Sequence, residues 1–230
     1  MINNRFNSKR TANGGFTLVE LLVVIGIIAI LAGVALGPIT NGIKKAKQSA
    51  GMQTGHVLAL AEFSFANDHD SNYPDISNQA GNSGTAAGAI VAPLLVSKYV
   101  SDPGIFVLSG SGATKVSITN AGSADIKSSS FDFVGNTGPG LNSNTPDSMP
   151  ILWSASSGTP PTAAALKATT AADLTATLAS TDTGAFGGDG LVVSFKNNSS
   201  KFIPAEAGKV VMVKDYVGVA DNFSVLSGTK

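Results

Sequence analysis

Few residues of this 230-residue chain could carry catalytic or metal chemistry. There is no cysteine, so disulfides, zinc–thiolate centres and cysteine nucleophiles are excluded. Asp68, His69 and Asp70 have the side chains of a metal site, but residues adjacent in sequence point in different directions, which favours a helix end and a turn. The chain contains no nucleophile elbow, phosphate-binding loop or His-Glu-x-x-His helix. We therefore expect that the protein is not an enzyme.

Glu20 is the acid whose position needs an explanation. It is the only charged residue from Phe16 to Ile43, and the 23 residues between it and Lys44 are uncharged and mostly apolar. About 20 apolar residues in a helix cross the ~30 Å hydrocarbon core of a bilayer, so this run predicts a membrane-spanning helix. An acid in lipid costs roughly 2.5–3.5 kcal/mol even on a permissive scale. Glu20 should therefore have a partner and a function.

The residues before the apolar run predict how the chain is oriented. Arg5, Lys9 and Arg10 precede it with no acid among them, which places the amino end in the cytoplasm and the rest of the chain beyond the inner (cytoplasmic) membrane. A cleaved secretory signal fits poorly, because its apolar region has only about 7–15 residues. A permanent single-span anchor fits the length, but it leaves Glu20 unexplained.

A third interpretation rests on the sequence Gly14-Gly15-Phe16-Thr17-Leu18-Val19-Glu20, followed by the apolar run. This segment resembles the processing site of type IV prepilins and of the pseudopilins of type II secretion. The resemblance implies that a prepilin peptidase cuts after Gly15 and methylates the new amino terminus at Phe16. It also implies that Glu20 meets the amino terminus of a neighbouring subunit during assembly. The implied partners are copies of the chain, other pilin-like subunits, an assembly platform membrane protein and its ATPase.

The apolar run continues into a second, amphipathic helical part. Gly37-Pro38 interrupts the run, because proline removes a helical hydrogen bond and typically kinks the helix. Beyond it, apolar residues at 3–4 spacing predict one buried stripe, and the helix is expected to end near residues 65–67. The stripe consists of Ala50, Thr54, Val57, Leu58, Ala61 and Phe65. The predicted organisation is a cleaved leader (1–15), a long helix (16–67, with 16–37 in the membrane and 38–67 amphipathic) and a globular domain (68–230).

The globular part is predicted to be rich in β-structure. Strands are expected at 105–108, 116–118, 131–134, 151–153, 191–195, 202–203 and 209–213, with a short helix in 86–100 broken near Pro93. Residues 163–178 could form a weak helix or a loop. The fold class is therefore α+β, with a long amino-terminal helix packed on a small antiparallel sheet. The run from Phe65 to Pro74 and the Asp102-Pro103 pair also resemble junctions found in pseudopilin-like proteins.

No cofactor is expected, with calcium as the alternative that the resemblance suggests. Major pseudopilins hold calcium in a carboxyl-terminal loop, and the acids of the right chemistry here are Asp182, Asp189, Asp215 and Asp221. They are scattered and form no dense acidic loop. Solvated loop acids are therefore the simpler interpretation.

The resulting hypothesis is a structural subunit of a type II secretion pseudopilus or a type IV pilus-like filament. The subunit would be stored in the bilayer through residues 21–36 and then assembled in the periplasm or at the cell surface. The alternative is a minor, tip or stand-alone subunit that binds a surface or a secreted substrate, for which Trp153 could be a sugar platform or a core residue. Nucleic acid is not expected as a partner, because 15 basic and 15 acidic residues give no net charge.

Overall fold

The computed structural model describes 11 stretches of the chain and divides it into two units, Met1–Ile43 and Lys44–Lys230. The described residues are 15–74, 87–111, 113, 117–120, 123–125, 129–136, 141–142, 144–179, 182, 184–218 and 223–226. Two residues singled out from the sequence, Gly14 and Asp221, lie outside them. The two units are described separately.

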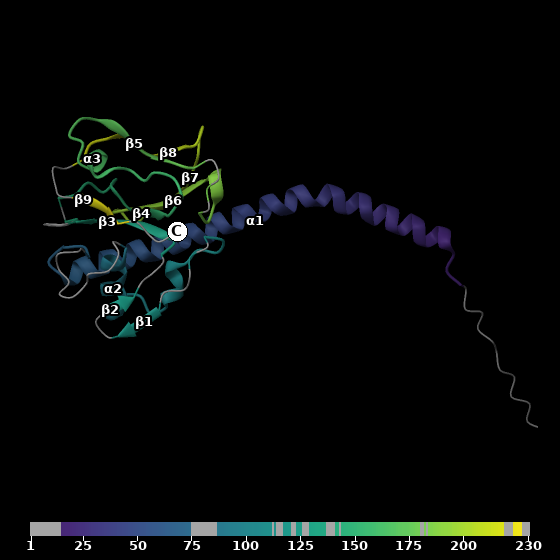
Figure 1. The fold of residues 1–230 in the computed structure, drawn as a ribbon, viewed down its shortest axis with the longest axis horizontal. Helices are drawn as coiled ribbons and strands as arrows, with labels where there is room; N and C mark the ends of the chain where they lie inside the picture. The colour runs from purple at the N-terminus through teal and green to yellow at the C-terminus, as the bar shows by residue number, and fades with distance from the viewer. Residues whose placement is uncertain are drawn as a thin grey trace, which may run out of the picture. The chain divides into compact units, whose positions relative to one another are not determined.

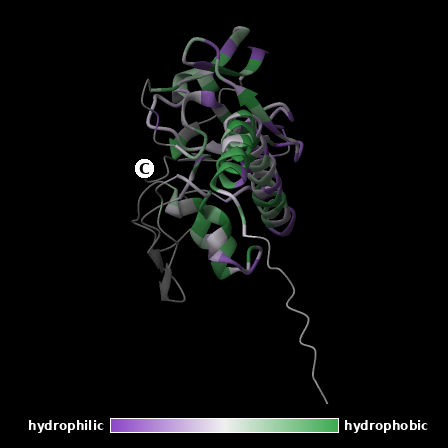
Figure 2. Cartoon of the chain, turned by 90° about the vertical axis from the view of Figure 1, so that its right-hand side faces the viewer, coloured by the Kyte–Doolittle hydropathy of each residue, from purple (hydrophilic) through white to green (hydrophobic). Residues whose placement is uncertain are grey.

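The first unit is the amino-terminal part of helix α1 (Leu18–Asp68). Its residues are exposed from Leu18 to Ile43, and most of them are hydrophobic (Figure 2). The helix continues through Gly37 and Pro38, because proline removes one hydrogen bond while the turns on either side keep theirs. The helix break predicted at these two residues stays a prediction.

The second unit combines the carboxyl-terminal part of α1 with an antiparallel five-stranded sheet of order β7-β6-β4-β3-β9 (Figure 1). Two further strand pairs, β1-β2 and β5-β8, complete the described β-structure, and β8 also contacts β6 and β7. The predicted α+β class is confirmed. The strands are β1 (Ser117–Asn120), β2 (Ser123–Asp125), β3 (Phe131–Asn136), β4 (Pro150–Ser154), β5 (Ala172–Thr177), β6 (Gly190–Phe195), β7 (Ser200–Pro204), β8 (Lys209–Tyr216) and β9 (Phe223–Leu226).

Short helices connect these strands and differ in part from the prediction. Helix α2 (Gly88–Val96) continues through Pro93, so the predicted break there is wrong. The segment predicted as a strand at 105–108 begins as a 3-10 helix, η1 (Pro103–Phe106). The segment 163–178 divides into a one-turn helix, α3 (Ala163–Leu166), and strand β5. A second 3-10 turn, η2 (Gly187–Asp189), leads into β6.

The core of the second unit forms where α1 meets the sheet. The buried face of the helix follows Gly51, Gly55, Leu58, Glu62 and Phe65, and the large buried side chains of β3 and β4 complete the core. The two glycines allow close approach, because a Cβ on Gly55 would lie 2.5 Å from the Ser194 hydroxyl oxygen. Packing thus accounts for glycines that each cost a helix roughly 1 kcal/mol relative to alanine.

Candidate functional site

The candidate processing site is the exposed segment that leads into α1. Gly15, Phe16 and Thr17 precede the helix without regular secondary structure, and all three are exposed. Neither the Gly15–Phe16 peptide bond nor the Phe16 side chain is covered by the described part of the chain. A peptidase could therefore reach this bond without unfolding the helix.

The first turn of α1 is closed by a reciprocal hydrogen-bonded cap between Thr17 and Glu20. The Thr17 backbone N–H donates to Glu20 Oε2 at 2.9 Å, and the Thr17 hydroxyl donates to the same oxygen at 2.8 Å. The Glu20 N–H in turn donates to Thr17 Oγ1 at 3.2 Å. This is the capping-box arrangement, which satisfies backbone donors that a helix start leaves unpaired.

The cap explains how a single subunit accommodates the acid Glu20 at the start of its apolar segment. Within a single subunit, the Glu20 carboxylate already has a partner on its own chain. Both hydrogen bonds reach Oε2, so Oε1 keeps its capacity to accept from another group. This role of Thr17 was not predicted, although the Thr-x-x-Glu spacing before an apolar run is its known signature.

Two exposed apolar surfaces follow on α1. The first covers residues 18–43, where the helix is long and apolar enough to cross a membrane by length and composition, with a mean hydropathy of 2.8 over its best 18 residues. The second lies in the other unit and consists of Val57, Leu60 and Phe63, each 45–47% exposed. Their spacing of three residues places them along one side of the helix. We call these three residues the distal stripe.

Three of the aspartates considered for calcium, Asp182, Asp189 and Asp215, are described by the structure, and they form no group that could hold a metal ion. Asp182 accepts hydrogen bonds from the Ser157 and Gly184 N–H groups, and Asp189 forms an ion pair with Lys44. Asp215 lies on β8 in a left-handed backbone conformation (φ 47°). Within the described stretches, no three His, Asp or Glu residues are grouped so that they could hold a metal ion. Calcium binding stays a prediction.

The remaining residues that attracted attention have structural contacts. The His69 ring stacks on Phe65 with 3.9 Å between ring centroids, and His56 Nδ1 lies 2.6 Å from the Asn198 carbonyl oxygen. Trp153 is buried, and its Nε1–H donates to Asp132 at 3.0 Å. A surface sugar platform at Trp153 is therefore wrong, and its core role is confirmed.

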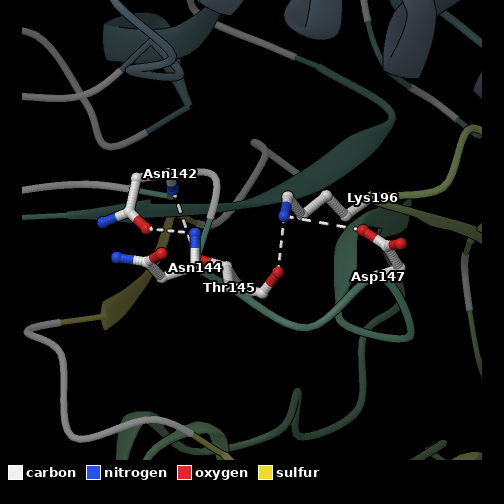
Figure 3. A network of polar contacts seen from close by, with 5 residues as sticks. All are labelled: Asn142, Asn144, Thr145, Asp147 and Lys196. Atoms are coloured by element: carbon white, nitrogen blue, oxygen red, sulfur yellow. Dashed lines mark hydrogen bonds and ion pairs between the residues drawn. The ribbon is translucent and has the colours of Figure 1, made fainter.

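A polar network holds the loop before β4 against the turn after β6 (Figure 3). The Lys196 ammonium donates to the Thr145 carbonyl oxygen and forms an ion pair with Asp147 at 3.6 Å. Asn142 and Asn144 extend the network, with the Asn144 N–H donating to Asn142 Oδ1 at 2.9 Å. Lys196 is largely buried while Asp147 is exposed, so the lysine stem also contributes packing.

Comparison with known proteins agrees with the chemistry of the amino-terminal segment. Residues 10–36 match the family model of the prokaryotic N-terminal methylation motif. Over 78 residues the chain is 37% identical to the type IV major pilin protein PilA of Myxococcus xanthus (strain DK1622), a match that covers 34% of each chain. No solved structure matches the chain. The methylation motif, this relative and the long apolar helix joined to an antiparallel β-domain together support a type IV pilin-like protein.

Proposed function

We propose that the chain is the structural subunit of a type IV pilus-like or type II pseudopilus filament, assembled through α1. The observation that carries this proposal is the distal stripe. A bilayer accounts for the apolar surface of residues 18–43, but Val57, Leu60 and Phe63 lie beyond the lysines at 44, 45 and 47. At 1.5 Å per residue, Leu60 is roughly 24 Å along the helix from Lys44, outside the hydrocarbon.

A permanent membrane anchor would leave this stripe in water. Exposed apolar side chains arranged along one side of a helix are typical of a surface that packs against another helix. The relative named above is a major pilin, which supports a subunit present in many copies. In this proposal, the apolar surface of residues 18–43 exchanges lipid for neighbouring helices, and the distal stripe extends the same contact outside the membrane.

The amino-terminal residues would act one after another, first in processing and then in assembly. The prepilin peptidase would cleave after Gly15, with Gly14 on the leader side, and Phe16 would become the methylated terminus. Thr17 and Glu20 both follow the cleavage point, so the cap survives the removal of the leader. Glu20 Oε1 would then be available to the amino terminus of a neighbouring subunit, which is the partner proposed for the buried charge in the filament.

The localisation follows from the same proposal. Before assembly the subunit spans the inner membrane once, with its amino end in the cytoplasm and residues 44–230 outside the cytoplasm. A platform membrane protein and its ATPase would supply the energy to lift the apolar helix out of the bilayer. Gly37 and Pro38, which α1 accommodates in the isolated chain, are the place where we expect the helix to open during that step.

The first experiment tests processing by the intact mass of the full chain, expressed in membranes with and without a prepilin peptidase. We expect the loss of residues 1–15 and the gain of one methyl group, and we expect Gly15→Ala to block both. An unprocessed wild-type chain would mean a permanent anchor.

The second experiment tests the distal stripe by comparing Leu60→Glu with Val217→Glu. Both substitutions place a charge on an exposed apolar residue, but Val217 lies off the helix. We expect filaments from the Val217 variant and from wild type, and none from the Leu60 variant, although all three chains are processed. Filaments formed equally well by both variants would refute the role of the stripe.

A further inference from the structure

A pocket of about 200 Å³ opens beside the first residues of the second unit. It is lined by Lys44, Lys47 and Gln48 of α1 and by Ala185, Phe186 and Asp189 of the loop before β6. Lys44 Nζ lies 2.9 Å from Asp189 Oδ2, and both side chains are substantially exposed to solvent. Lys47 forms no ion pair among the described residues, so its positive charge is not neutralised locally.

The apolar wall of this pocket is formed by Phe186, which packs against α1 and against a second aromatic ring. The Phe186 ring packs against Gly51, where a Cβ would lie 2.6 Å from its Cζ atom, and it meets the Phe202 ring edge-on at 5.5 Å between centroids. The pocket thus combines an aromatic wall with ammonium groups at its mouth. Lysines next to apolar side chains such as Phe are typical of surfaces that lie at the boundary between hydrocarbon and headgroups, because the lysine stem lies along apolar surface while the ammonium stays in water.

The two lysines of the pocket follow the apolar run closely in the sequence, which favours a position near that boundary. Lys44 is the first charged residue after the 23 uncharged residues that would span the bilayer, and Lys47 is one helical turn further on. From residue 21 to residue 61, α1 carries three lysines and no acid. Asp189, from a distant part of the sequence, is the only acid that lines the pocket among the described residues.

We propose that this pocket binds the phosphate of an anionic phospholipid headgroup while the subunit resides in the membrane. The charge balance favours an anionic over a zwitterionic lipid, because two lysines, Lys44 and Lys47, line the pocket with one acid, Asp189. The Lys44–Asp189 ion pair is the arrangement without lipid, in which Asp189 takes the place of the phosphate. The subunit can therefore release the lipid without leaving Lys44 unpaired. This inference rests on the membrane residence proposed above.

The test is native mass spectrometry of the full-length chain released from nanodiscs that contain phosphatidylglycerol, phosphatidylethanolamine and phosphatidylcholine in equal amounts. We expect phosphatidylglycerol to be retained preferentially. Each lysine near an anionic surface contributes about fivefold in binding, so Lys44→Gln and Lys47→Gln should each lower retention by about that factor. Lys214→Gln, an exposed lysine on β8, is the matched control and should change nothing. Asp189→Asn should raise retention, because it removes the competing carboxylate.

The outcomes separate this site from the proposed function. Equal retention of the three lipids, or equal loss in the Lys214 control, would overturn the site. Displacement of the lipid by inorganic phosphate at millimolar concentration would also overturn it, since it would show a site for free phosphate. Peptidase processing and filament formation are measured in separate experiments. They can therefore be observed when lipid retention is not, and lipid retention can be observed when they are not.

Discussion

The most informative perturbation of the domain is Glu62→Gln. Glu62 lies on the buried face of α1 and is 1% exposed, and its Oε1 has no hydrogen-bond partner among the residues that the structure describes. Burial raises the pKa of this carboxyl well above its ordinary value of 4.5. The folded protein therefore keeps a proton on Glu62 at a pH where the unfolded chain has already lost it.

The sign of the pH dependence follows directly. Unfolding releases one proton between pH 4.5 and the raised pKa, so the free energy of unfolding falls as the pH rises through this window. One proton corresponds to a slope of at most about 1.36 kcal/mol per pH unit. Glutamine keeps the shape and cannot ionise, so Glu62→Gln should remove this slope. The two proteins should have similar free energies of unfolding near pH 4.5. Above this pH, the free energy of unfolding of the variant should exceed that of wild type by an amount that grows with pH.

The assay is urea unfolding of the full chain in neutral detergent, followed by the fluorescence of the buried Trp153 at several pH values from 4.5 to 8. Burial, Glu62 and Asp147 raise the pKa of the neighbouring Tyr73 to about 12, so that phenol does not titrate in this window. Asp147 is present in both proteins, so its contribution cancels when the pH profiles of wild type and Glu62→Gln are compared. Glu206→Gln, at an exposed site, is the control. Parallel pH profiles for wild type and Glu62→Gln would refute the reasoning.

Three further predictions concern the cap, the helix–sheet contact and the phenols. Thr17→Val should lower the helicity of the first turn of α1 and reduce the stability of that turn by about 1 kcal/mol, whereas Thr17→Ser should keep the cap. Faster hydrogen exchange of the first-turn amides in the valine variant than in the serine variant would show this difference. Gly55→Val should destabilise the domain by roughly 1–3 kcal/mol in thermal unfolding, whereas Gly42→Val, which has open space, should leave it nearly unchanged. Burial raises the pKa of Tyr73 and Tyr216 to about 12, so a phenolate titration at 295 nm should leave both largely protonated at pH 10.5, and normal titration of either would contradict their burial.

The long helix could be predicted well because its signal is local. An uncharged apolar run fixed the first part of α1, and its observed end at Asp68 lies one residue beyond the predicted range. The buried face was predicted less well, because the stripe included Val57, which is exposed. The true buried line contains Gly51, Gly55 and Glu62, which hydrophobic periodicity does not count. Those residues face inward because of the sheet that packs on them, which is tertiary information.

The errors in the β-domain have similar causes. Ile105 and Phe106 suggested a strand, but Asp102 accepts a hydrogen bond from the Gly104 N–H at 2.8 Å, and Pro103 starts a 3-10 turn. The composition of β5 suggested a helix or a loop, and pairing with β8 decides its conformation. At the candidate site, the Thr17–Glu20 cap could have been predicted from the Thr-x-x-Glu spacing. The contact of Asp189 with Lys44 could not, because the two residues are distant in sequence and only the fold brings them together.

The close contact of α1 with β6 also has a mechanical consequence. A pull along α1 loads this contact in shear, and the helix resists sliding in both directions. A shift of one turn in one direction brings Ala59 to the place of Gly55, where a Cβ would meet the Ser194 hydroxyl at 2.5 Å. A shift in the other direction brings Lys47 to the place of Gly51, beside the Phe186 ring. The close packing at these two glycines therefore opposes sliding in either direction and transmits tension from the helix to β6, the strand next to the edge strand β7.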